Sequence, residues 1–180
     1  LLTFSVTAAP LLARQVAAAA APRPPSAAAL YLPLLPLVLI QTTLRLRWPG
    51  VQNLYDDWAN VAYYGCFFGL GFAVARRPQW ETVIAGEWPR AAAFGLGAAA
   101  AMTLGWLAQG GVASPTPTAG GLAIQALSAV AGYCIVVALL GGARRFLDFA
   151  TPALAYLVDA ALPIYVLHQL AIVAIGSAVI

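Results

Sequence analysis

The sequence carries very little charge, and one of the two common cationic residues is missing from it. Only 8% of its 180 residues are charged, six of them acidic and nine of them arginine, and there is no lysine. A water-soluble domain carries roughly 25% charged residues, so these side chains are too few to cover a soluble globule of this length. With 62% hydrophobic residues and a mean hydropathy of +0.85, the chain is predicted to be an integral membrane protein.

Histidine and cysteine are also scarce, which excludes several kinds of site. His168 is the sole histidine, and Cys66 and Cys134 each lie inside an apolar run. The cysteines lack the spacing of a metal site or a redox pair and are interpreted as small buried hydrophobic residues, so no metal is expected. The usual motifs of soluble enzymes, such as a nucleophile elbow or a phosphate-binding loop, are absent from the sequence. The arginines cluster at the ends of apolar runs, so the formal charge of +3 does not indicate nucleic-acid binding.

Long apolar runs are what the sequence does contain. A helix needs about 20 mainly apolar residues to cross a hydrocarbon core of roughly 30 Å. Complete spans are predicted at residues 30–44, 58–75, 91–107 and 122–140, with a fifth beginning near Ala160. The first span is short and is expected to borrow a turn from residues 27–29. The predicted fold class is therefore all-α, a polytopic membrane helix bundle of about five spans.

Three further segments complete the predicted organisation. Residues 78–90 contain tryptophan, glutamate and arginine and are expected to form an amphipathic piece at the membrane interface. Residues 1–12 resemble half a span, and the last apolar run continues to Ile180. We therefore expect residues 1–180 to form a single transmembrane domain with both ends truncated, a fragment of a longer protein that would be inactive alone.

The distribution of arginine predicts the orientation of the bundle. If Arg76 and Arg77 face the cytoplasm, alternation of the spans leaves only Arg45 and Arg47 outside. The arginines placed inside are then Arg14, Arg23, Arg76, Arg77, Arg90, Arg144 and Arg145. Because cytoplasmic loops carry an excess of arginine and lysine, this orientation is strongly favoured over its reverse.

His168 lies in the middle of the last apolar run and is a candidate functional residue. Ionisable groups inside a membrane are costly and often mark a functional path, and a histidine with a pKa near neutrality can act as a general acid or base. Tyr165 lies three residues earlier on the same helical face, so Tyr165 and His168 form the natural pair. Gln169 points about 100° away and is expected to bond another helix. The alternative is that His168 only packs between helices.

A second candidate group opens the span at residues 58–75. Asp57 and Asn60 share one helical face, and Tyr64 extends that face inward. The functional interpretation is an outward-facing substrate site formed by these three residues. The alternative is an acidic helix start, stabilised by the helix dipole, with Trp58 as an interfacial anchor.

Two stretches resemble a known family in the expected order. Residues 161–169, Ala-Leu-Pro-Ile-Tyr-Val-Leu-His-Gln, resemble the late P-x-Y-x-L-H helix of the acyltransferase-3 membrane family. Residues 53–60, Asn-Leu-Tyr-Asp-Asp-Trp-Ala-Asn, run into 63–72, Tyr-Tyr-Gly-Cys-Phe-Phe-Gly-Leu-Gly-Phe. This second stretch is similar to the D-W…FF-x-x-G span of the branch related to glucan biosynthesis protein C.

The resemblance implies a roughly ten-helix enzyme of the bacterial inner membrane. Such an enzyme moves an acyl group from cytoplasmic acyl-CoA, a co-substrate rather than a cofactor, to the hydroxyl of an extracytoplasmic glycan or glucan. Tyr165 and His168 would then line a channel through the bundle. The catalytic histidine of the family, with its companion arginine, lies in early helices that would precede Leu1. The alternatives are a transporter or flippase-like bundle and a purely structural membrane subunit.

Overall fold

The computed structural model describes residues 25–50, 56–111, 116–147, 149, 151, 155–157 and 159–161. The chain divides into two compact units, Leu1–Phe146 and Leu147–Ile180. All elements named below belong to the first unit. The prediction that residues 1–180 form one transmembrane domain stays a prediction.

The described part of the first unit is built from helices, and no strand occurs among its described residues. The elements are α2 (Ala27–Tyr31), α3 (Leu34–Leu39), the π-helical turn η1 (Ile40–Leu44), α4 (Arg45–Arg47), α5 (Trp58–Ala75), α6 (Gln79–Ala108) and α7 (Ala119–Phe146). The predicted all-α class is therefore confirmed.

Four helical segments in the described residues are long and apolar enough to cross a membrane. They are Ala27–Arg47, which joins α2 to α4, Trp58–Ala75, Gln79–Ala108 and Ala119–Phe146. The four predicted complete spans are thus confirmed, and the first does gain its extra turn from residues 27–29. The fifth predicted span lies mostly outside the described residues. The protein is a multi-pass membrane protein.

The first span is irregular for reasons that can be read in its sequence. Ser26 caps α2 by accepting a hydrogen bond from the Ala29 amide at 3.2 Å. The helix is then interrupted before Pro33, which has no N–H to donate to the preceding turn. The hydroxyl of Tyr133, on α7, donates to the backbone carbonyl of Leu30 at this break. A polar side chain from a neighbouring helix therefore satisfies a carbonyl beside the interruption.

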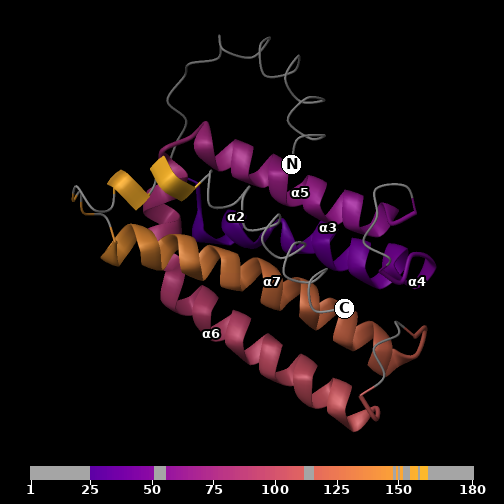
Figure 1. Cartoon of the computed structure of the whole chain (residues 1–180). Helices are drawn as coiled ribbons and strands as arrows, with labels where there is room; N and C mark the ends of the chain where they lie inside the picture. Colours follow the sequence, from indigo (N-terminus) through magenta and orange to yellow (C-terminus); the bar gives the residue numbers. More distant parts are fainter. Residues whose placement is uncertain are drawn as a thin grey trace, which may run out of the picture. The chain divides into compact units, whose positions relative to one another are not determined.

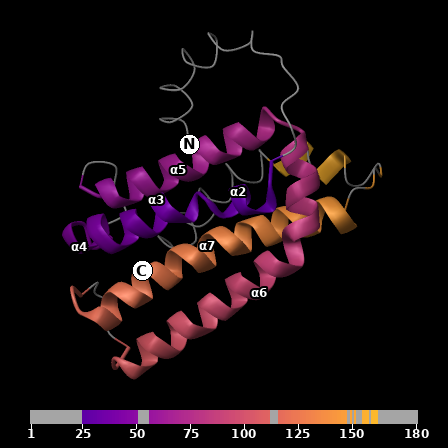
Figure 2. The same cartoon turned by 180° about the vertical axis from the view of Figure 1, so that it is seen from behind.

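Helix α6 is longer than a membrane requires, and it bends. Its 30 residues correspond to about 45 Å at 1.5 Å per residue. The interior Pro89 accounts for the change in direction visible in its first half in Figure 2. The sequence predicted two pieces here, an interfacial segment at 78–90 and a span at 91–107, whereas the structure has one kinked helix.

The closest helix pair is α6 with α7. Figures 1 and 2 show the two running alongside each other, with α2–α4 and then α5 on the other side of α7. On α6 the buried Ala91, Gly95 and Ala98 follow helical spacing along one face. Small residues let helix backbones approach closely, which is how helices associate without a hydrophobic driving force in lipid.

Two ion pairs establish which helix ends lie together. Arg144, near the end of α7, pairs with Glu81 in the first turn of α6 at 2.9 Å. Arg45, in α4, pairs with Asp57, the N-cap of α5, at 3.4 Å. A short connection of three residues, 76–78, joins α5 to α6. The four spans therefore alternate in direction, as predicted.

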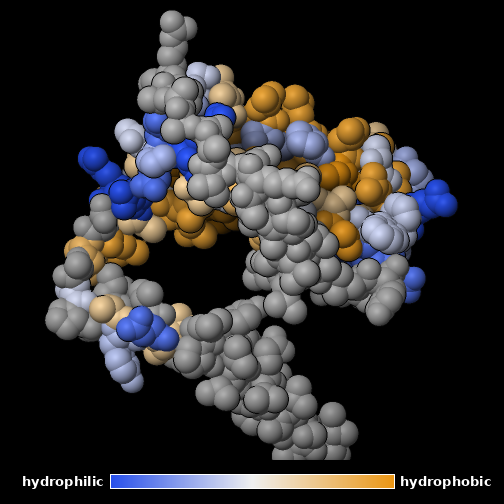
Figure 3. Space-filling model, turned by 90° about the horizontal axis from the view of Figure 1, so that it is seen from above, coloured by the Kyte–Doolittle hydropathy of each residue, from blue (hydrophilic) through white to orange (hydrophobic). Residues whose placement is uncertain are grey.

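The two ends of the bundle differ in charge. Among the described residues of the first unit, one end, called the basic end below, has five arginines and two glutamates, namely Arg76, Arg77, Glu81, Glu87, Arg90, Arg144 and Arg145. The other, the balanced end, has two arginines and two aspartates, namely Arg45, Arg47, Asp56 and Asp57. In Figure 3, hydrophilic residues gather towards two sides of the helices and hydrophobic surface lies between them. This is the distribution expected of a bundle whose middle sits in hydrocarbon.

Candidate polar site at the balanced end

Arg45 is the centre of a buried polar cluster where the first span meets α5. Its side chain is only 12% exposed, and its partner Asp57 has no exposed surface. The guanidinium Nη1 donates to both carboxylate oxygens of Asp57 at 3.4 Å, and Nη2 donates to Asn60 Oδ1 at 2.6 Å. Nε donates to Gln41 Oε1 at 3.0 Å. The arginine is therefore held by three side chains from two spans.

Asp57 has two roles, one in the helix start and one in the cluster. As the N-cap of α5, its Oδ1 accepts a hydrogen bond from the backbone N–H of Asn60 at 2.9 Å. Its Oδ2 accepts from the side-chain amide of Asn60 at 2.6 Å. Aspartate is a preferred N-cap residue, and its charge also favours the helix N-terminus. The acidic helix start is therefore present and forms part of the polar cluster, while the substrate site stays a prediction.

Gln41 enters the cluster from the π-helical turn η1. It is only 7% exposed, and its side-chain oxygen accepts the hydrogen bond from Arg45 Nε. Two threonine hydroxyls in this turn donate to carbonyls of the preceding turn, Thr42 to Val38 at 2.8 Å and Thr43 to Leu39 at 2.6 Å. Back-bonding of this kind distorts a helix locally. Single π-helical turns are often found at functional sites.

The predicted site residues have different outcomes. Asp57 and Asn60 lie together in the cluster, as their spacing predicted. Tyr64 is 60% exposed and contacts Tyr63 edge-on, with ring centroids 5.9 Å apart. Trp58 is 56% exposed at the start of α5, in keeping with an interfacial anchor. Tyr165, His168 and Gln169 lie outside the described residues.

Two members of the cluster, Arg45 and Gln41, are not among the predicted site residues. The position of Arg45 at the end of an apolar run predicts only the orientation of the bundle. One signal was available, because Gln41 and Arg45 are four residues apart and share a helical face. The contact of that face with Asp57, twelve residues further along from Arg45, depends on how the first span and α5 pack.

The cluster combines a compensated charge pair with neutral amide groups. The Arg45 and Asp57 charges compensate each other, and Asn60 and Gln41 add amide donors and acceptors. Asn60 is half-buried and the Arg45 side chain is 12% exposed, whereas Asp57 is fully buried. Asp57 holds those two side chains in position.

The fold and this cluster define the class of protein, an α-helical multi-pass membrane protein with a buried polar site at one end of its bundle. No protein-family model, curated protein or solved structure matches the chain.

Proposed function

We propose that this chain is part of a membrane-bound O-acyltransferase of the bacterial inner membrane. Acyl-CoA enters from the basic end and a glycan from the balanced end, and the two meet in a channel through the bundle. There the glycan hydroxyl attacks the thioester, an ester forms, and CoA leaves as a thiol that takes up the hydroxyl's proton. The observation that carries the proposal is the buried ion pair of Arg45 with Asp57 and the hydrogen bond of Arg45 to Asn60. Asp57 and Asn60 both belong to the stretch at residues 53–60 that resembles the acyltransferase-3 family.

The polar cluster supports a role in binding the acceptor. Sugar hydroxyls both donate and accept hydrogen bonds, and the guanidinium of Arg45 and the amide of Asn60 together supply both functions. Both side chains are preorganised by Asp57. Such preorganisation lowers the entropy that binding would otherwise cost.

The basic end supports a role in binding the donor. Arg77, Arg144 and Arg145 are exposed there, among five arginines and two glutamates. The phosphates of coenzyme A are anionic, and arginine is well suited to phosphate because it can bind with two parallel N–H groups. The same excess of arginine predicts that this end faces the cytoplasm, where acyl-CoA is found.

His168 and Tyr165 complete the proposal as the groups that handle the proton of the acceptor hydroxyl. A histidine is the commonest general base for such a step, and the shared helical face of Tyr165 provides a hydrogen-bonding partner. Gln169 and Tyr64 are assigned to substrate contacts along the path.

Transfer of label in membranes tests this function. The full-length protein is supplied with labelled acyl-CoA and a glucan acceptor, and label should appear on the glucan. Asn60→Ala should lower transfer by about tenfold or more, because it removes a hydrogen bond to a charged group, whereas Arg47→Gln, at the same end but exposed, should leave transfer nearly unchanged. Movement of glucan across the membrane without acylation would contradict the proposal and favour the transporter.

A further inference from the structure

A partly open apolar cavity of about 150 Å³ lies within the first unit, lined by residues of α2, α5, α6 and α7 and by Pro33. Its wall includes Leu30, Phe67, Trp80, Ile84, Tyr133 and Leu140. The Tyr133 hydroxyl is directed to the Leu30 carbonyl, so these two polar groups satisfy each other and leave the wall apolar. A cavity with such a lining favours hydrocarbon over water.

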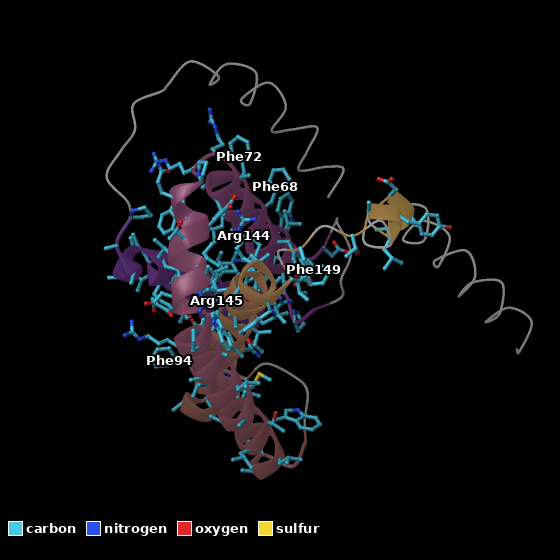
Figure 4. The ribbon with its side chains drawn as sticks, turned by 90° about the vertical axis from the view of Figure 1, so that its left-hand side faces the viewer. Phe68, Phe72, Phe94, Arg144, Arg145 and Phe149 are labelled. Atoms are coloured by element: carbon cyan, nitrogen blue, oxygen red, sulfur yellow. The ribbon has the colours of Figure 1, made fainter. Side chains whose placement is uncertain are left out.

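The cavity lies in the half of the bundle nearest the basic end. On α5 its lining ends at Val74, and Arg76 and Arg77 follow. On α7 its lining ends at Leu140, and Arg144 and Arg145 follow within five residues. One helical turn is about 5.4 Å, so the arginines lie roughly a turn beyond the apolar wall. Figure 4 looks onto this end, where Arg144 and Arg145 are labelled.

An apolar cavity beside an excess of positive charge suits a molecule with a hydrocarbon chain and a phosphate-bearing head. We propose that the cavity holds the acyl chain of the acyl-CoA donor and limits that chain to about six carbons. This inference rests on the proposed function and adds the chain length of the donor. The size follows from volume, because a cavity of about 150 Å³ accommodates a benzene-sized group.

Gly71 provides a way to fill the cavity without disturbing the helix. It lines the cavity on α5, and a Cβ built there meets no atom within 4 Å. Gly69 lies on the same helix, is also exposed and is equally open to a Cβ, but it is not part of the cavity wall. Gly71→Leu and Gly69→Leu therefore form a matched pair of variants. Only the leucine at position 71 is placed in the cavity wall.

Binding of a series of acyl-CoA probes tests the inference. The full-length protein in zwitterionic lipid nanodiscs is titrated with CoA, butanoyl-CoA, hexanoyl-CoA and dodecanoyl-CoA. Affinity should rise about threefold to fourfold per methylene up to hexanoyl-CoA, the usual gain for burying a methylene, and then stop rising. Gly71→Leu should weaken hexanoyl-CoA binding at least tenfold, and Gly69→Leu should change it less than twofold.

Three results would overturn the inference. The first is an affinity that keeps rising to dodecanoyl-CoA, as for simple partitioning into lipid. The second is an equal effect of the two leucine substitutions. The third is displacement of hexanoyl-CoA by anionic phospholipid as readily as by unlabelled probe, which would identify a lipid site. The experiment measures binding and not transfer. If the acyl-CoA affinities follow the predicted pattern but the protein transfers no acyl group, only the proposed function is refuted. Acyl transfer with unchanged binding in Gly71→Leu would refute only the inference.

Discussion

Arg45 lies at the end of the first span, where its charge is almost completely buried within the protein. Burying a charge is unfavourable by several kcal/mol unless it is paired and hydrogen-bonded. The structure pairs Arg45 with Asp57 and completes its hydrogen bonds through Asn60 and Gln41. Among the described residues, no buried side-chain nitrogen or oxygen lacks a hydrogen-bond partner. The cluster is therefore a fully satisfied network, the condition under which buried charges are tolerated.

Removing one member of the pair should be strongly destabilising. Arg45→Ala removes the guanidinium that pairs with the buried carboxylate of Asp57, and we expect a loss of roughly 3–5 kcal/mol in the free energy of unfolding. Arg47→Ala is the control. Arg47 is exposed and lies over the ring of Trp48 at 5.4 Å, so its loss should cost about 1 kcal/mol or less. Equilibrium unfolding in mixed micelles measures both, and equal losses would show that Arg45 is not structurally special.

Two substitutions of His168 distinguish a catalytic role of this residue from a packing role. If it handles the acceptor proton, His168→Ala should lower turnover per folded protein on the order of 10²-fold or more. His168→Gln should be similarly slow, because glutamine can form hydrogen bonds but cannot titrate near neutrality. If His168 only packs, each change should instead reduce stability by roughly 0.6–2 kcal/mol. Wild-type turnover in both variants would refute the catalytic assignment.

Among the helices, regular spans were predictable and irregular ones were not. The bounds of α5, Trp58–Ala75, agree with the predicted span because Asp57 is a strong start signal and two arginines and a proline follow the end. The π-helical turn at Ile40–Leu44 was missed, because periodicity does not distinguish it from an α-helical turn. The sequence did not predict that α6 is one continuous, kinked helix. A proline usually ends or kinks a helix, so Pro89 favoured two separate segments.

The α6–α7 contact makes a prediction about two nearby glycines. A Cβ added at Gly95 would lie 2.9 Å from Ile135 Cγ1 and 3.0 Å from the Ile135 backbone nitrogen, whereas one at Gly97 would meet nothing within 4 Å. Gly95→Val should therefore destabilise the bundle by about 1–3 kcal/mol through overpacking. Gly97→Val should have little effect. Thermal unfolding in detergent compares the two, and equal midpoints would contradict the packing described for these helices.

For the whole molecule, composition alone predicted the class, and the arginine pattern predicted the separation of charge between the two ends. The ion pair of Glu81 with Arg144 lies at the basic end, and the ion pair of Arg45 with Asp57 lies at the balanced end. The two pairs therefore mark opposite ends of the alternating spans. The polar cluster was only half predictable. Asp57 and Asn60 are close in sequence, whereas their contact with Arg45 depends on packing between two spans. No local pattern encodes that contact.

The assignment of the two ends to opposite sides of the membrane is tested most directly by cysteine accessibility in intact cells. In a background with Cys66 and Cys134 replaced by alanine, single cysteines are introduced at Ser114, between α6 and α7, and at Pro78, beside Arg77. A membrane-impermeant maleimide added outside should label the cysteine at 114 and not the one at 78, because the end richer in arginine faces the cytoplasm. Labelling at 78 but not at 114 would reverse the bundle and place the polar cluster on the cytoplasmic side. Labelling at both positions would contradict the alternating spans themselves.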